Sequence, residues 1–181
     1  MTAEGLRLIV VRGNSASGKS TLARELQLAM GRGTANIGQD HFRRIVLREH
    51  DIPHGDNITL IEQTAQHCLA LGYHVIVEGI LVAEHYGSML RGLIATHLGP
   101  HHIFYLDVSL EETLKRHAGR ALSGEVDAAK LREWYVPFDV LAVPGEVVLD
   151  SNANLVGLLN VVLEHVGPVA PRDVHGSSRF L

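Results

Sequence analysis

Residues 13 to 20 carry the most specific chemical pattern in the chain. They read Gly-Asn-Ser-Ala-Ser-Gly-Lys-Ser, which matches the spacing G-x-x-x-x-G-K-[ST]. The glycines allow a close approach of the backbone, and successive N–H groups can form a nest for anions. Lys19 can reach phosphate oxygens, and the Ser20 hydroxyl can ligate Mg²⁺. The pattern predicts a loop that binds the phosphates of a nucleoside triphosphate through Gly13, Asn14, Ser15, Ala16, Ser17, Gly18, Lys19, Ser20 and Thr21.

The segments on either side of this loop support the prediction. An apolar run, Leu6 to Val11, precedes it and has the composition of a buried strand. A segment of helix-favouring residues begins at Lys19, so the positive end of a helix dipole would point at the phosphates. The alternative, a flexible Gly/Ser loop, does not require this strand and helix context.

Acidic residues follow several of the expected strands. In open parallel sheets ligands gather at the carboxyl ends of the strands, so these positions are candidates for catalysis. Asp40 is our candidate general base for an acceptor hydroxyl and a candidate Mg²⁺ ligand; its alternative is a helix N-cap. Glu78 is the preferred second acid, for Mg²⁺ or substrate, and Asp107 and Asp150 are its rivals.

Two arginines offer positive charge farther along the chain. Arg116 and Arg120 lie four residues apart and precede a small polar stretch, which is typical of a hinged cationic lid over about residues 116–136. Guanidinium groups over the γ-phosphate would offset the charge that develops during transfer. The alternative is an exposed helix face with solvated arginines.

Strand and helix patterns alternate along the chain, which predicts an α/β fold with a parallel sheet covered on both faces. After the first strand, the expected strands are Thr34–Gly38, His74–Glu78, His101–Val108 and Glu146–Leu149. The expected helices are Lys19–Met30, His41–His50, Asn57–Leu71, Val82–His97, Leu110–Ala118, Ala128–Tyr135 and Asn154–His165.

Length and composition limit the classes of function. The chain has 181 residues, and we expect one domain over residues 1–166 and a C-terminal arm over 167–181. A net charge of −4 argues against nucleic-acid and anionic-membrane partners, which need a basic face. The single cysteine, Cys68, and the lack of a signal-peptide pattern favour a cytoplasmic protein. The sequence is compatible with both a monomer and a homodimer.

The phosphate loop, the Gln39-Asp40 and Glu78-Gly79 strand ends and the Arg116…Arg120 pair together resemble small P-loop kinases of metabolites and antibiotics. The likeness is greatest to the chloramphenicol phosphotransferase and zeta-toxin-like group, and it spans roughly residues 6 to 150. It implies a three-layer αβα fold with five parallel strands in the order 2-3-1-4-5. It also implies ATP and Mg²⁺ as cofactors, Asp40 as catalytic base, and Lys19, Arg116 and Arg120 on the phosphates.

The same resemblance suggests an acceptor site after the second and third strands. That site would draw on Gln39, His41, Arg44, Glu78 and Tyr86. Residues 134–139 could add an aromatic wall, or pack at a helix end. The leading hypothesis is O-phosphorylation of a small molecule, such as an antibiotic of the nucleoside type exemplified by capuramycin. The alternatives are a zeta-toxin-like sugar-nucleotide kinase and a nucleotide-dependent ATPase or switch.

Overall fold

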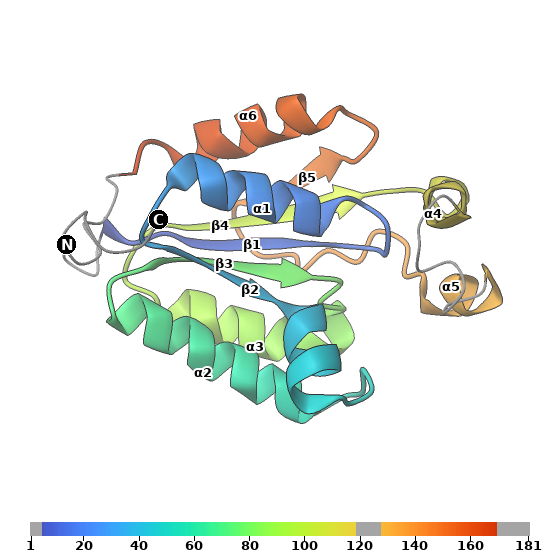
Figure 1. Cartoon of the computed structure of the whole chain (residues 1–181), viewed down its shortest axis with the longest axis horizontal. Helices are drawn as coiled ribbons and strands as arrows, with labels where there is room; N and C mark the ends of the chain where they lie inside the picture. Colours follow the sequence, from blue (N-terminus) through green and yellow to red (C-terminus); the bar gives the residue numbers. More distant parts are fainter. Residues whose placement is uncertain (1–4, 119–127, 170–181) are drawn as a thin grey trace.

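A five-stranded parallel sheet forms the centre of the computed structural model, which describes residues 5–118 and 128–169 (Figure 1). The strand order is β2-β3-β1-β4-β5, so the predicted order and fold class are confirmed. All four neighbouring pairs are parallel. The strands are β1 (Leu8–Gly13), β2 (Thr34–Gly38), β3 (His74–Gly79), β4 (His101–Asp107) and β5 (Glu146–Asp150).

Helices cover both faces of this sheet. One apolar core joins the sheet to α1 and α6, and a second core joins its other face to α2 and α3. Figure 1 shows these two helical layers on opposite sides of the strands, with α4 and α5 beyond the carboxyl ends. The helices are α1 (Lys19–Met30), η2 (His41–Leu47), α2 (Asp56–Ala70), α3 (Ala83–Thr96), α4 (Leu110–Ala118), α5 (Ala128–Trp134) and α6 (Leu155–Val166).

The middle strands are the most deeply buried parts of the sheet. Every residue of β1 and of β3 is buried, whereas β2 and β5 at the edges are only partly buried. Strands covered on both faces need apolar residues at successive positions, which explains the continuous runs Leu8–Val11 and Val75–Val77. The register pairs Val11 with Glu78 of β3 and with Phe104 of β4. The carboxyl end of β1 therefore lies between the carboxyl ends of β3 and β4.

The helix after β2 differs from the prediction. We expected a helix from His41 to His50, but the structure has a π-helix that ends at Leu47. Arg48 follows it in the left-handed conformation, with φ of 54°, and the Glu49 N–H donates to the Arg43 carbonyl. Helices commonly end at a residue in the left-handed conformation, which is usually glycine. Here that residue is an arginine, so the sequence gives no signal for the end of the helix. Short π-helices are found frequently at functional sites.

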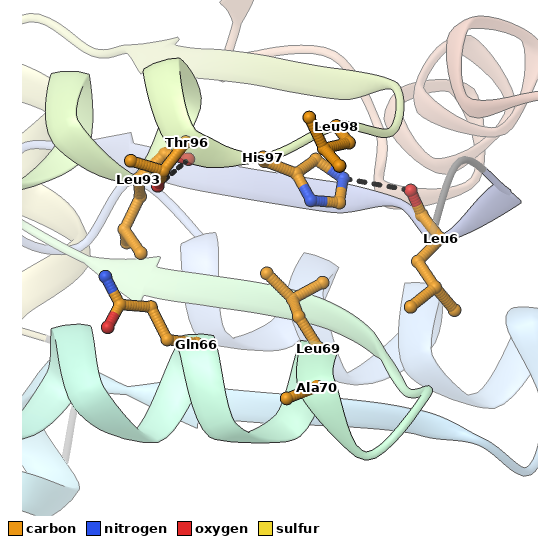
Figure 2. Close-up of a pocket in the computed structure, with 8 residues that line it drawn as sticks. All are labelled: Leu6, Gln66, Leu69, Ala70, Leu93, Thr96, His97 and Leu98. Carbon is orange, nitrogen blue, oxygen red and sulfur yellow. Dashed lines mark hydrogen bonds between the residues drawn. The ribbon is translucent and has the colours of Figure 1, made fainter. Parts of the chain in front are cut away.

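An apolar hollow lies at the end of the sheet where the strands begin, which is the end opposite the phosphate loop. Figure 2 shows it between α2 and α3, beside Leu6 at the entry to β1. Its volume is about 300 Å³, and His97 Nε2 lies 3.0 Å from the Leu6 carbonyl oxygen. Because Leu6 precedes β1, the hollow is at the amino ends of the strands, away from the phosphate loop. Among the described helices, none is long and apolar enough to cross a membrane.

Candidate active site

The phosphate loop joins β1 to α1, so the predicted strand and helix lie on either side of it. Gly18 has a φ of 97°, and Ala16 is also left-handed with a φ of 59°. At Gly13 a Cβ atom would collide with the backbone carbonyl of Leu106 in the neighbouring strand β4. An open cavity of about 390 Å³ lies at the start of α1, lined by Ala16, Gly18, Lys19, Ser20 and Thr21. Free N–H groups and the helix dipole make this place favourable for phosphate.

Lys19 lies folded over its own loop. Its Nζ donates to the Asn14 carbonyl at 2.8 Å and lies 3.4 Å from the Ser17 hydroxyl oxygen. The residue is only 7% exposed. These contacts hold the ammonium group at the loop that is expected to surround the phosphates.

Glu78 contacts the phosphate loop directly. The Ser20 hydroxyl donates to Glu78 Oε2 at 2.9 Å, because β3 is the neighbour of β1 in the sheet. Burial raises the pKa of Glu78, although the Ser20 hydrogen bond and the charge of Lys19 oppose the shift. A hydroxyl and a carboxylate oxygen at this separation suit Mg²⁺, which prefers oxygen ligands. The contact places Glu78 beside Ser20, the other residue predicted to hold Mg²⁺, and the metal site itself stays a prediction.

Asp40 presents a different environment two residues beyond β2. Its side chain is 64% exposed and pairs with Arg43 at 2.9 Å and with Arg44 at 3.2 Å. The side chain makes no capping hydrogen bond to η2, so the N-cap interpretation is not what the structure has. The register pairs Gly38 with Glu78, which brings Asp40 to the same carboxyl end of the sheet as Glu78. The charge of Asp40 contributes to the raised pKa of Glu78.

The predicted acceptor residues divide into exposed and buried ones. His41 is exposed, and the Arg44 side chain is 40% exposed, so both are open to solvent at η2. Gln39 and Tyr86 are instead buried, at 2% and 0% exposure. Their part in acceptor binding stays a prediction, and in this structure their side chains bond to other protein groups.

Gln39 and Tyr86 belong to one hydrogen-bond network. Gln39 Nε2 donates to the Tyr86 hydroxyl at 2.8 Å and to Asp51 at 3.0 Å, and Gln39 Oε1 accepts from the Leu81 N–H at 3.0 Å. The Tyr86 hydroxyl lies 2.8 Å from Asn57 Oδ1. Burial raises the pKa of Tyr86, and the charge of Asp51 adds to the shift. This network fixes the turn that follows Glu78.

Gly79 fits closely against this network. A Cβ atom there would collide with the Gln39 side chain, so only glycine allows Gln39 to cross the end of β3. The absence of a Cβ atom at Gly79 thus lets the β2 strand end pack against the β3 strand end.

Of the two arginines predicted to bind phosphate, the structure describes Arg116 but not Arg120. Arg116 Nε donates to Glu112 at 2.7 Å, and its Nη2 donates to the Ser151 carbonyl at 3.0 Å and to Asn152 at 3.2 Å. These contacts tie α4 to the turn after β5. Arg120 and much of the predicted lid lie outside the described residues.

Arg12 is an important residue that sequence reasoning missed. It is fully buried in β1, directly before the phosphate loop, and pairs with Asp139 at 2.7 Å and with Glu146 at 3.6 Å. Its guanidinium also donates to the Leu81 carbonyl at 2.9 Å and to the Asp139 carbonyl. Burial lowers the pKa of Arg12, while both carboxylates oppose the shift. An arginine directly between the apolar run and the phosphate loop was the available signal, because a buried charge at such a position requires partners.

Asn14 also has a role beyond its predicted contact with nucleotide. Its side-chain amide donates to the Val136 carbonyl at 2.7 Å and accepts from the Val136 N–H at 3.1 Å. The side chain thus clamps residues after α5 onto the phosphate loop, and its backbone remains part of that loop.

Sheet order and phosphate loop together place the chain in the class of P-loop kinase folds. A model of the AAA domain family, AAA_33, matches residues 8–140, and the chain belongs to this family. Among curated proteins no match was found.

Several solved structures share the fold. A sugar kinase from Janibacter sp. HTCC2649 is 22% identical with a TM-score of 0.68, covering 89% of this chain and 94% of that one. A gluconokinase from Sinorhizobium meliloti 1021 is 19% identical with a TM-score of 0.63, covering 90% and 93%. The Mycobacterium tuberculosis APS kinase CysC, in complex with AMPPNP and APS, is 16% identical with a TM-score of 0.68, covering 90% and 98%. At these identities the likeness shows the fold.

Proposed function

We propose that the protein transfers the γ-phosphate of ATP to a hydroxyl group of a small molecule, with Mg²⁺ as cofactor. The observation that carries the proposal is the hydrogen bond of 2.9 Å between the Ser20 hydroxyl and Glu78. It joins the phosphate loop to a strand-end acid, and the register of β2 and β3 brings Asp40 to the same edge. Phosphoryl transfer needs a phosphate cradle, a metal site and a proton acceptor, and these residues could supply them.

Each residue has one task in this proposal. The amides of the phosphate loop and the Lys19 ammonium hold the β- and γ-phosphates. Ser20 and Glu78 would hold Mg²⁺, which supplies positive charge to the phosphates when bound. Asp40 accepts the proton of the acceptor hydroxyl. At the same time the hydroxyl oxygen of the acceptor attacks the γ-phosphorus, and the bond between the γ-phosphorus and the β–γ bridging oxygen breaks. The exposure of Asp40 leaves its carboxylate accessible to an incoming acceptor.

The choice of acceptors to test follows from the comparisons and from the sequence resemblance. The similar structures include a gluconokinase, a sugar kinase and an APS kinase. The resemblance adds sugar nucleotides and hydroxylated antibiotics, among them nucleoside antibiotics such as capuramycin. The net charge of −4 disfavours a nucleic-acid acceptor, so an oligonucleotide with a free 5′-hydroxyl serves as a contrasting substrate.

The test is mass-detected transfer of phosphate from ATP, with Mg²⁺, to this panel of acceptors. We expect at least one small molecule to gain a phosphate with wild-type protein and none with Lys19→Ala. ATP hydrolysis that no acceptor accelerates would contradict the proposal and favour a nucleotide-driven switch. Phosphorylation of the oligonucleotide alone would contradict the small-molecule acceptor.

A further inference from the structure

The segment that links α5 to β5 is fixed to the candidate active site at two points. Asn14 of the phosphate loop clamps Val136 through two hydrogen bonds of 2.7 and 3.1 Å. Three residues later, Asp139 pairs with buried Arg12 and accepts from the Ala83 N–H at 3.0 Å. Residues 136–139 therefore span from the nucleotide loop to the start of α3. Figure 1 shows this segment and η2 at the carboxyl side of the sheet.

Phe138 lies between these two clamps and remains exposed. Its exposed fraction is 58%, and its ring makes a T-shaped contact with Tyr105, with ring centroids 6.3 Å apart and planes at 74°. An aromatic side chain normally gains its stability by burial, which this position provides only in part. Packing therefore accounts for only part of the ring surface.

The backbone at Phe138 is strained as well. Its φ of 49° is in the left-handed region, which glycine adopts readily and a bulky residue does not. Strained residues persist where the surrounding structure fixes them, and they gather at ligand-binding sites. The clamps at Val136 and Asp139 supply that fixation. The molecule thus holds an exposed aromatic ring in an unfavourable conformation.

We propose that Phe138 forms an acceptor subsite that binds a ring face of the molecule to be phosphorylated. This inference rests on the proposed kinase function and adds the chemical class of the acceptor. An exposed aromatic face attracts another flat or C–H-rich face, so the ligand is a cyclic compound, with either an aromatic ring or a sugar ring. The contacts of Arg12 support this location, because Arg12 binds Asp139 and also the Leu81 carbonyl, three residues after Glu78.

The test compares two glycine variants with the same backbone effect. Phe138→Gly relieves the strain and removes the ring. Ala142→Gly relieves the same kind of strain, at φ of 54° and at an exposed position, and leaves Phe138 intact. Phe138→Tyr keeps an aromatic face and serves as the conservative variant. We expect the melting temperature of Phe138→Gly to equal or exceed that of wild type, so that a binding defect does not reflect unfolding.

Binding is measured by calorimetry with Mg²⁺ and AMPPNP present, which occupy the nucleotide site. The probes are phenyl β-D-glucopyranoside for an aromatic ring, methyl β-D-glucopyranoside for a sugar ring, and sorbitol for an acyclic polyol. We expect wild type, Ala142→Gly and Phe138→Tyr to bind one or both glucosides, and Phe138→Gly to bind them roughly tenfold more weakly. Sorbitol should bind weakly to all four proteins.

Equal binding by Phe138→Gly and wild type would overturn the inference. So would preference of wild type for sorbitol, or failure of wild type to bind either glucoside. Phosphate transfer is measured separately, which keeps the two proposals distinguishable. Ring-dependent binding without transfer to any acceptor contradicts the kinase function alone, whereas transfer that is unchanged in Phe138→Gly contradicts the subsite alone.

Discussion

The end of β3 and the start of η2 each bring a carboxylate to the same edge of the sheet, in opposite environments. Glu78 is buried and bonded to the Ser20 hydroxyl, and burial raises its pKa. Asp40 is 64% exposed and pairs with Arg43 and Arg44 of its own helix. The strand therefore fixes one acid against the nucleotide loop, while the π-helix leaves the other accessible to an acceptor. This difference is the physical basis for giving the metal to Glu78 and the proton to Asp40.

Lys19→Ala should have the largest effect, because in the proposed mechanism both carboxylates act only when a triphosphate is bound. We expect phosphate transfer to fall to background and the affinity for an ATP analogue to weaken, since the loop loses its only side-chain cation. Calorimetric titration and a transfer assay measure the two effects. Lys115→Ala is the matched control, because the Lys115 side chain is 79% exposed on α4. Unchanged titration of Lys19→Ala would contradict the assignment of the phosphate loop.

Asp40→Asn tests the accessible acid. Loss of a general base commonly lowers the rate about 10² to 10⁴-fold, and we expect that loss in kcat with unchanged binding of the ATP analogue. The exposed position predicts an unaltered melting temperature. Full turnover by Asp40→Asn would remove this residue from the mechanism and abolish the contrast with Glu78.

Glu78→Gln tests the buried acid through stability as well as activity. The raised pKa means that folding disfavours the ionised form of Glu78, so this group lowers the free energy of unfolding above its folded pKa. The variant should be more stable than wild type at neutral pH, and the difference should vanish as the pH falls below the unfolded value of about 4.3. Transfer should fall, with a higher requirement for Mg²⁺. Denaturant unfolding across this pH range measures the effect, and a less stable variant at neutral pH would contradict it.

Arg44→Ala should have the smallest effect. Exposed ion pairs contribute about 0 to 1 kcal/mol, so the loss of the Arg44–Asp40 pair should leave the melting temperature nearly unchanged. If Arg44 contacts the acceptor as predicted, the KM for the acceptor rises and kcat is retained. A fall in kcat equal to that of Asp40→Asn would show instead that Arg44 is needed to orient the carboxylate.

Local patterns were enough to predict the alternation of strands and helices and the position of the phosphate loop, whereas the strand order came from the resemblance to small P-loop kinases. The bounds of β2, α1 and α4 coincide with the predicted ones, because periodic apolar residues and glycines mark them in the sequence. The apolar run that ends in Glu78 likewise indicated a buried strand followed by an acid. These features depend on neighbours in the chain, which a sequence displays directly.

The supporting contacts could not be predicted in the same way. Asn14 and Val136 are 122 residues apart, and Arg12 and Asp139 are 127 residues apart. No local pattern indicates that the Gln39 side chain bonds to Tyr86. The early end of η2 at Leu47 depends on a left-handed arginine, for which composition gives no signal. Such contacts follow from the assembled sheet.

The position of β1 has a consequence for how the molecule assembles. Its two neighbours in the sheet are β3 and β4, which are synthesised much later than β1. Pairings between such distant segments slow folding, and an incomplete chain exposes apolar strands that favour aggregation. The phosphate loop therefore acquires its shape only after His101–Asp107 has emerged, so the candidate nucleotide site is completed late in the synthesis of the polypeptide.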